Sequence, residues 1–503
     1  MLKPTKNNDD KNKIVHGIAW LITLSWANRI LGFFSIIILA RLLSPEDFGV
    51  MAIIVISIQL TETLSNIGSE QYFIQKNNAN NDDLNCAWTS NLIIKTSASV
   101  LFAVIAPIIA TFFHYQHIIP ALLSISLLPF ITALSNGNII KLKKELNYKK
   151  FVFIATLAKL MANVSAMAAA VYLANYWALV IGALLNSLLY SLFSYLFIKQ
   201  RAHWGLENWQ QQFQFSKWII LKGLIGHIRA KFDVWYASTI QGISALGGYN
   251  FAKDLALLPS RELLSPISEV FFTAIAKSEN NSNEQKLKIR KAITIIYIIA
   301  LPIAFGWTII AEPFTQVVLG DKWLPYIPTL AVLGFLVITF AVGNFISQVM
   351  TATGKVRALF YYDLFTLALS LIMLLSVSSL VHSIETLALT RVLIGLTILL
   401  IGFLWLHFYK IISIQKIIKP AFYPLFISTL LVYCVERLFA FIHNPIIFLL
   451  ITIVTSVLFY LSAILVGCKY NLLGKIESKF VLDLFRQNGK TIYIRLCHSK
   501  KHI

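Results

Sequence analysis

Charged residues inside apolar stretches are the groups in this sequence whose types suggest chemistry. Ten basic residues fall within the predicted membrane spans: Arg29, Lys95, Lys159, Lys222, Arg229, Lys231, Lys253, Arg261, Arg391 and Arg437. Seven acidic residues fall within the same spans: Glu62, Asp233, Asp254, Glu262, Glu269, Asp363 and Glu436. Ten basic residues facing lipid would cost on the order of 30 kcal/mol. Most must therefore face protein, water or the interface, and the basic surplus favours a polar cavity for an anion.

Helical spacing selects the candidate residues of that cavity, because residues three, four or seven apart share a helix face. Arg29 lies on a polar helix face with Asn28, about halfway along its span. Its side chain is therefore too deep to reach the membrane surface easily. The planar, permanently charged guanidinium group of Arg29 is well suited to binding phosphate oxygens. The candidate substrate-binding residues are Asn28, Arg29, Lys95, Lys159, Lys222 and Arg229.

Other interpretations stay open for some of these charges. Lys222 lies near a span end and could snorkel to the interface. Asp254 and Arg261 could form an internal ion pair around the break at Pro259. The candidate ion-coupling residues, which could carry protons or simply pair with basic groups, are Glu62, Asp233 and Asp254.

The elements that position these residues are membrane helices. Hydrophobic residues make up 57% of the 503, and only 13% are charged. Apolar runs of about 20 residues recur throughout, which is the length that crosses a bilayer. We predict an all-α integral membrane fold with about fourteen transmembrane helices, at 14–40, 49–67, 86–113, 118–140, 152–174, 177–198, 218–240, 246–276, 292–311, 327–353, 358–380, 386–409, 421–442 and 445–467. The first run continues without a cleavage site, so we expect no signal peptide.

The loops predict an orientation. On the side that carries both termini we count 31 lysines and arginines, whereas the opposite side has only Arg41 and Lys322. Positive residues are retained in the cytoplasm, so we expect both termini there and a multi-pass protein of the bacterial inner membrane. Most of the net charge of +20 is thus explained by topology, and nucleic acid is not an expected partner.

We expect two pseudo-repeated bundles around a central polar cavity. The segments 42–52 and 240–252 align weakly when Gly49 is set against Gly247, and internal repeats are common in transporters whose halves rock around a site. The predicted organisation is a six-helix bundle, a cytoplasmic interfacial connector, a second six-helix bundle, two additional helices and a basic cytoplasmic tail, at 1–198, 199–217, 218–409, 410–468 and 469–503.

Signatures of catalysis are absent from the sequence. There is no Walker A sequence, no HExxH and no GxSxG, so we predict no catalytic residues and no enzyme activity. The four cysteines and the histidines show no metal-ligand spacing, so we expect neither a metal nor a cofactor.

Two regions carry a resemblance to a known family. Residues 26–75 contain ARLLSPEDFG at 40–49, followed by a helix and then Gly68 and Gln75, and this resembles the opening of Wzx-type polysaccharide exporters. Residues 232–277 and LGDKWLPYIP at 319–328 resemble later family segments in the same order. The sequence departs from the family pattern at 67–71 and near Thr273.

The resemblance implies a lipid-linked oligosaccharide flippase within the group of multidrug, oligosaccharidyl-lipid and polysaccharide exporters. Its expected substrate is an undecaprenyl-pyrophosphate-linked glycan, moved by alternating access, with membrane lipid and polysaccharide polymerase machinery as expected partners. We expect Arg29 to contact the diphosphate. The alternatives are a lipid II flippase, a multidrug or metabolite antiporter of the same architecture, and a membrane glycan polymerase or ligase, against which the small periplasmic loops argue. The sequence leaves the glycan, the energy source and the oligomeric state open.

Overall fold

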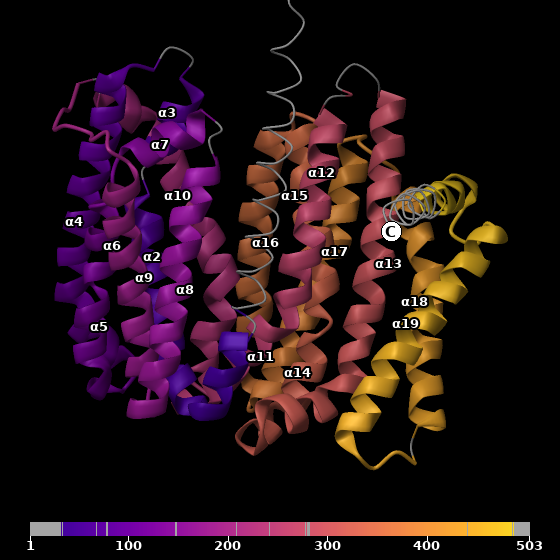
Figure 1. Ribbon diagram of the computed structural model, residues 1–503. Coiled ribbons are helices and arrows are strands. Elements are labelled where there is room, and N and C mark those ends of the chain that lie inside the picture. Colours follow the sequence, from indigo (N-terminus) through magenta and orange to yellow (C-terminus); the bar gives the residue numbers. More distant parts are fainter. Residues whose placement is uncertain are drawn as a thin grey trace, which may run out of the picture. The chain divides into compact units, whose positions relative to one another are not determined.

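The chain folds into long helices that run side by side (Figure 1). The computed structural model describes residues 32, 34–66, 68–76, 79–145, 148–207, 209–240, 242–276, 278, 282–439, 441–484 and 486. These residues form helices and turns, and no strand occurs among them. The candidate residues Asn28 and Arg29 lie outside the described residues, as does the side chain of Lys222.

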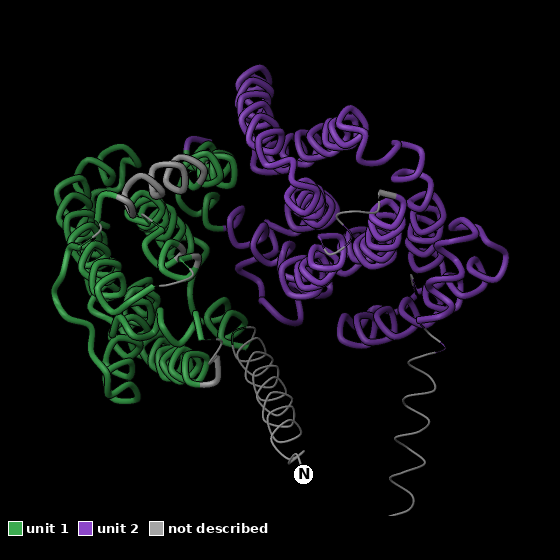
Figure 2. Tube along the Cα trace, turned by 90° about the horizontal axis from the view of Figure 1, so that it is seen from above, with its two compact units in different colours: residues 1–238, 242–247 green, residues 239–241, 248–503 purple. Residues whose placement is uncertain are grey.

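Contacts divide the chain into two compact units, coloured separately in Figure 2. Unit 1 comprises residues 1–238 and 242–247, and unit 2 comprises residues 239–241 and 248–503. The helices of unit 1 are α2 (Pro45–Ser65), α3 (Ser69–Gln75), α4 (Asn81–Phe112), the 3-10 turn η1 (Gln116–Ile118), α5 (Ile119–Ile125), α6 (Leu127–Ala133), α7 (Asn138–Lys144), α8 (Tyr148–Leu173), α9 (Trp177–Phe197) and α10 (Trp209–Ala237). The chain passes into unit 2 within α11 (Gly242–Pro259).

Unit 2 continues from α11 into a π-helical turn, η2 (Ser260–Leu264), which follows Pro259 directly. Its further elements are α12 (Ser265–Ala276), α13 (Ser282–Phe314), η3 (Thr315–Leu319), η4 (Asp321–Tyr326), α14 (Ile327–Leu333), α15 (Leu336–Ala352), α16 (Val356–Ser376), η5 (Ser378–Leu380), α17 (Ile384–Phe408), α18 (Ile414–Leu438) and α19 (Pro445–Lys469).

The membrane class predicted from the sequence is confirmed. Among the described residues, ten helices are long and apolar enough to cross a membrane, or eleven if the bent pair formed by 321–333 and 336–352 counts as one span. The predicted spans 218–240 and 246–276 correspond to α10 and to α11 with α12, which carry several charged residues and fall outside this apolar set. Residues 14–31 and 33 of the first predicted span lie outside the described residues, so the total of fourteen stays a prediction.

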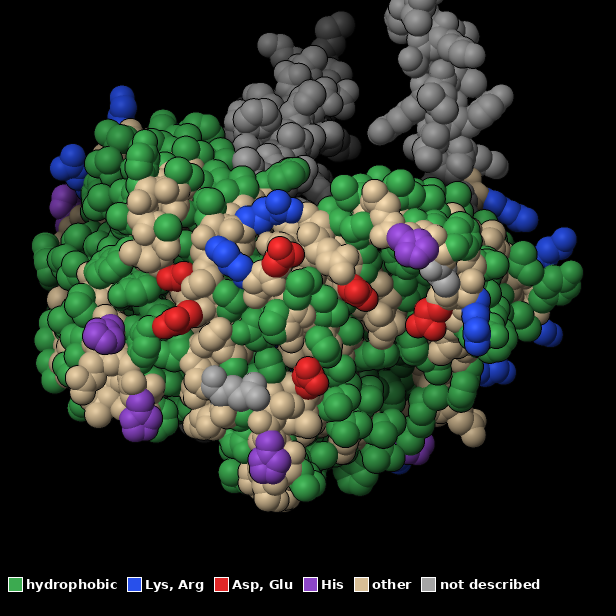
Figure 3. Space-filling view, turned by 90° about the horizontal axis from the view of Figure 1, so that it is seen from below, with side chains coloured by type: hydrophobic (Ala, Val, Ile, Leu, Met, Phe, Trp, Pro, Cys, Tyr) green, Lys and Arg blue, Asp and Glu red, His purple; other side chains and the backbone are tan. Residues whose placement is uncertain are grey.

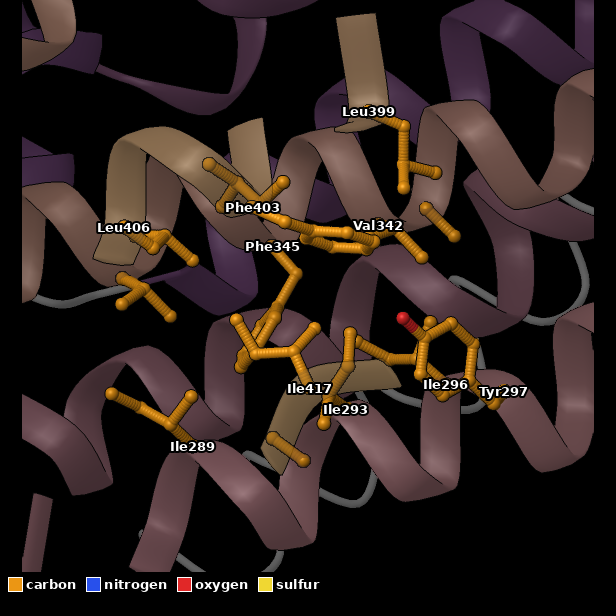
Figure 4. Close-up of a cluster of buried hydrophobic side chains, with 14 of the residues drawn as sticks. Ile289, Ile293, Ile296, Tyr297, Val342, Phe345, Leu399, Phe403, Leu406 and Ile417 are labelled. Atoms are coloured by element: carbon orange, nitrogen blue, oxygen red, sulfur yellow. The ribbon is translucent and has the colours of Figure 1, made fainter. Parts of the chain in front are cut away.

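The packed centre of unit 2 lies between α13, α15, α17 and α18. Buried aliphatic and aromatic side chains interlock there, as Figure 4 shows. Phe345 of α15 and Phe403 of α17 are buried among leucines and isoleucines, with Ile293 of α13 on the neighbouring helix. No charged residue belongs to this cluster. It is therefore scaffold, and the chemistry must be sought elsewhere.

Charged side chains lie at both ends of the helices. Figure 3 shows the face at the lower ends in Figure 1, where basic, acidic and imidazole side chains are interspersed among apolar ones. The lysine-rich segments 141–150, 286–291 and 410–419 lie at the opposite ends of their helices. The loop count predicts that these lysine-rich ends face the cytoplasm, and this orientation stays a prediction.

Residues 45–49 of the exporter-like segment form the start of α2. Ser44 is the N-cap, Pro45 occupies the first turn, and the Asp47 carboxylate accepts a hydrogen bond from the Ser44 amide at 2.9 Å. The second oxygen of Asp47 accepts from the backbone amide of Tyr176 at 2.8 Å. Tyr176 is the N-cap of α9, so one carboxylate fixes the starts of two helices.

We expect Asp47→Ala to destabilise unit 1 by about 2 kcal/mol, because it removes a capping box and leaves the Tyr176 amide without its acceptor. Thermal unfolding of the purified protein measures the loss. Asp82→Ala is the matched control, since Asp82 is an exposed acid in the first turn of α4. Equal melting temperatures for the two variants would contradict this structural role.

Glycine lets α2 and α11 approach at their N-terminal ends. A Cβ atom on Gly247 would lie 1.8 Å from the Pro45 carbonyl oxygen and 2.5 Å from the Gly49 nitrogen. A Cβ atom on Gly49 would lie 2.0 Å from the Ile243 carbonyl oxygen. The two glycines that align in the sequence repeat therefore meet at one backbone crossing within unit 1.

Candidate functional site

A polar pocket of about 340 Å³ lies inside unit 1, beneath the short helices α3 and α7. Its walls come from α2, α3, α4, α6, α7 and α9 and from the turns that precede α3 and α7. The charged, amide, hydroxyl and aromatic side chains in its lining are Glu62, Asn66, Ser69, Glu70, Trp88, Asn91, Lys95, Thr132, Ser135, Asn136, Lys143 and Tyr190. Such a lining is unusual among helices that are otherwise apolar.

Ion pairs and hydrogen bonds hold α3 and α7 over the pocket. The Lys143 ammonium pairs with the Glu70 carboxylate at 2.6 Å, although 73 residues separate them along the chain. Lys144 donates to the carbonyl oxygen of Phe73 at 3.0 Å and also to that of Lys76. Beside them, Lys76 pairs with the buried Asp83 carboxylate at 2.7 Å, and this hydrogen bond raises the pKa of Lys76.

The turn before α7 is fixed by a buried amide. The Asn136 side chain donates to the carbonyl oxygens of Ile198 at 3.2 Å and Gln200 at 2.7 Å. Trp88 is held in a similar way, because its indole nitrogen donates to the Ser135 carbonyl oxygen at 3.0 Å. These two residues shape the wall of the pocket with their own polar groups already satisfied.

Other groups in the lining point to a ligand. The side chains of Glu62, Asn91, Lys95 and Tyr190 make no hydrogen bond or ion pair with any residue that the structure describes. The Ser69 hydroxyl is buried and also lacks a hydrogen-bond partner. Glu62 is exposed, and Asn91, Lys95 and Tyr190 are half-buried, so these groups are free to bind water or a polar occupant of the cavity.

The charges of the pocket balance within its described lining. Glu62 and Glu70 face Lys95 and Lys143, and Lys95 lies in the fields of the other three. Since Glu70 and Lys143 already pair directly, Glu62 and Lys95 remain available to a ligand. Charged donors and acceptors side by side suit a hydroxyl-rich molecule better than a lone anion.

The predicted residues are thus partly brought together. Lys95 of α4 and Glu62 of α2 line the same pocket. Lys159 instead has an exposed side chain on α8 and does not line it. Asp254 accepts from Arg261 at 3.1 Å, as in the ion-pair interpretation, and from Asn250 at 3.3 Å.

Two further candidates lie one helical turn apart on α10. Asp233 is fully buried, and Arg229 is half-buried. Each takes part in an interaction, so neither is a free charge. Neither lines the polar pocket.

Sequence reasoning missed Glu70, Lys143 and Tyr190. Lys143 counts among the loop lysines, and Glu70 falls where the sequence departs from the exporter pattern. Spacing along one helix cannot reveal them, because they reach the pocket from α3, α7 and α9.

A second concavity, of about 550 Å³, is apolar and lies along α2 and α4, with Trp235 at its edge. Ser57 and Thr61 line it, but their hydroxyls donate to backbone carbonyls of α2 at 2.8 and 3.0 Å. The groove therefore presents hydrocarbon, as expected for a surface in contact with lipid chains.

The helical, multi-pass architecture and the polar pocket are those of a membrane transporter. The family model described as "Polysaccharide biosynthesis protein" matches residues 38–328, more than half of the chain. The chain belongs to this family, and the resemblance to Wzx-type exporters is confirmed.

Individual relatives of the chain are also named for polysaccharide biosynthesis. The chain is 24% identical over 363 residues to the lipopolysaccharide biosynthesis protein WzxC of Escherichia coli, which covers 71% of this chain and 73% of the relative. It is 22% identical over 343 residues to the succinoglycan biosynthesis transport protein ExoT of Rhizobium meliloti, covering 66% and 67%. Among solved structures, an inward closed lipid II flippase MurJ matches with a TM-score of 0.68 at 15% identity, over 88% of this chain and 97% of that one, and so shares its fold.

Proposed function

We propose that this chain moves undecaprenyl-pyrophosphate-linked oligosaccharide units from the cytoplasmic to the periplasmic leaflet during polysaccharide biosynthesis. The observation that carries the proposal is the polar pocket, which offers unpartnered hydrogen-bonding groups among membrane helices of a polysaccharide biosynthesis protein. Lys95 lies roughly 20 Å along α4 from its first residue, at 1.5 Å rise per residue. A charged residue at this depth is expected in a protein that transports a polar headgroup, because it can bind that headgroup. A purely structural membrane protein has no such reason to carry it.

The pocket takes a sugar of the headgroup in this proposal. Balanced charges, amides and a tyrosine hydroxyl can donate to and accept from sugar hydroxyls. The diphosphate stays assigned to residues that the sequence predicts, Arg29 foremost, with Asn28, Lys222 and Arg229, whereas Lys159 is exposed on α8 and has no part in this proposal. The polyprenyl tail stays in the bilayer beside apolar helix faces.

Transport proceeds by alternating access, with both termini in the cytoplasm and a polysaccharide polymerase as the acceptor of the product. The partition of 31 basic residues against two supports this orientation. Glu62 is the acidic residue of the pocket and our candidate for ion coupling. The Arg261 pair of Asp254 supports a structural role for that carboxylate.

Lys95→Gln tests the proposal. We expect glycan export in a strain that lacks the native protein to fall by about 10-fold or more, because hydrogen bonds to charged groups contribute roughly 1.5–3 kcal/mol. Surface glycan and lipid-linked intermediates are measured together, and the intermediates should accumulate. Lys159→Gln is the matched control on an exposed face of α8.

The outcomes separate the alternatives. Full export by a normally inserted Lys95→Gln variant would show that the pocket does not take part in transport. Loss of export in Lys159→Gln alone would place the substrate site on α8. Growth arrest with accumulated lipid II would instead identify a lipid II flippase. Unchanged intermediates combined with altered drug resistance would identify an antiporter.

A further inference from the structure

A short helix at the C-terminal end of unit 2 is not accounted for by transport. After α19 the chain turns at Gly474, whose φ is +113°, and residues 475–484 are helical. A Cβ atom on Gly474 would lie 2.6 Å from the Glu477 carboxylate, so the turn needs glycine. The sequence predicts only a basic tail from residue 469 onward. The structure gives the start of that tail a fixed place.

One face of this helix is anchored to α13. The Glu477 side chain is 1% exposed and accepts from the Arg290 guanidinium at 2.5 and 2.7 Å. The Lys291 ammonium lies 4.8 Å from the ring centroid of Phe480. Val481 is buried in an apolar cluster with residues of α18 and α19. In Figure 1 this yellow end of the chain lies beside the upper part of α13.

The opposite face is basic and partly apolar. Lys475, Lys479 and Arg486 are exposed and lie within about 40° of one another around the helix, at 100° per residue. Ile476, beside them, is 42% exposed. None of these three basic side chains pairs with an acidic residue within the part of the chain that the structure describes.

The neighbouring helix ends extend this surface. Exposed lysines follow α17, begin α18 and end α19, at Lys410, Lys416, Lys419 and Lys469. Of the acidic residues in the helix itself, Glu477 is buried against Arg290, and Asp483, which follows Lys479 by one turn on the basic face, is only partly exposed. The surface thus combines a cluster of positive charge with exposed aliphatic groups at the level where the membrane helices end.

We propose that this surface binds the headgroups of anionic phospholipids, such as phosphatidylglycerol or cardiolipin. Basic clusters next to a membrane helix attract anionic lipid, and an amphipathic helix can insert its apolar side chains among the acyl chains. The preference for basic cytoplasmic loops explains lysines on this side, but a loose tail would satisfy that preference equally well. The buried Arg290–Glu477 pair instead holds three basic residues of one helix face at a fixed place.

Lipid titration of the purified full chain tests the proposal. A triple variant with Lys475→Gln, Lys479→Gln and Arg486→Gln should bind phosphatidylglycerol on the order of 100-fold more weakly. Each of the three clustered residues is expected to contribute about fivefold to the affinity for an anionic surface. Binding of the wild type should weaken with added salt. The matched control replaces the exposed Lys150, Lys199 and Lys355 by glutamine and should bind like the wild type.

Three results would overturn the proposal. One is equal affinity of the wild type and the triple variant for phosphatidylglycerol. Another is equal affinity of the wild type for phosphatidylcholine. The third is tight binding of heparin with no effect of anionic lipid, which would indicate a soluble polyanion as the partner. Unchanged melting in phosphatidylcholine nanodiscs confirms that the triple variant is folded.

Discussion

Gly247→Ala is expected to prevent the native packing of α11 against α2. The added methyl group would lie 1.8 Å from the Pro45 carbonyl oxygen, and the nearby atoms of Gly49 are also backbone. Overpacking costs about 1–3 kcal/mol where side chains can move, and more is expected here because α2 is fixed at this point by the Asp47 capping box. The measurement is the yield of monodisperse protein and its melting temperature.

Gly226→Ala and Gly343→Ala are the matched controls for this prediction. A Cβ atom at either position meets nothing within 4 Å, and neither glycine has a positive φ. Helical propensity alone makes alanine slightly more stable there. Wild-type yield and melting for Gly247→Ala would mean that the backbone crossing is looser than the structure has it.

Glu477→Ala is expected to destabilise unit 2 by about 3 kcal/mol, the lower end of the range for a broken buried pair. The variant leaves the Arg290 guanidinium, which is 21% exposed, without its counter-charge. The release of the C-terminal helix should also expose it to protease. Melting temperature and limited proteolysis of residues beyond 469 measure the two effects.

Two comparisons make this prediction specific. Glu284→Ala removes an exposed i,i+4 pair with Lys288 and should change stability by less than about 0.5 kcal/mol. The double variant Arg290→Met with Glu477→Leu should recover most of the lost stability, because no unpaired charge remains. Failure of the double variant to recover would assign the loss to packing instead of charge.

The sequence by itself determined the class of this protein. Apolar runs of membrane length, the asymmetry of lysine and arginine between loops, and the spaced residues at 40–49 are local or additive features, so they can be read without coordinates. The deep basic residues also drew attention to α4, because the cost of charge in lipid depends on position along one helix.

Only the tertiary structure decided which charges meet. Lys95 and Glu62 come from different helices, and Glu70 and Lys143 are joined across 73 residues by the packing of α3 on α7. It also gave the aspartate of the exporter-like segment its capping role at Tyr176, and brought the repeated glycines into one crossing. Spacing predicts which residues share a helix face, but the partner of that face is set by how helices pack, and no pattern within one helix contains that information.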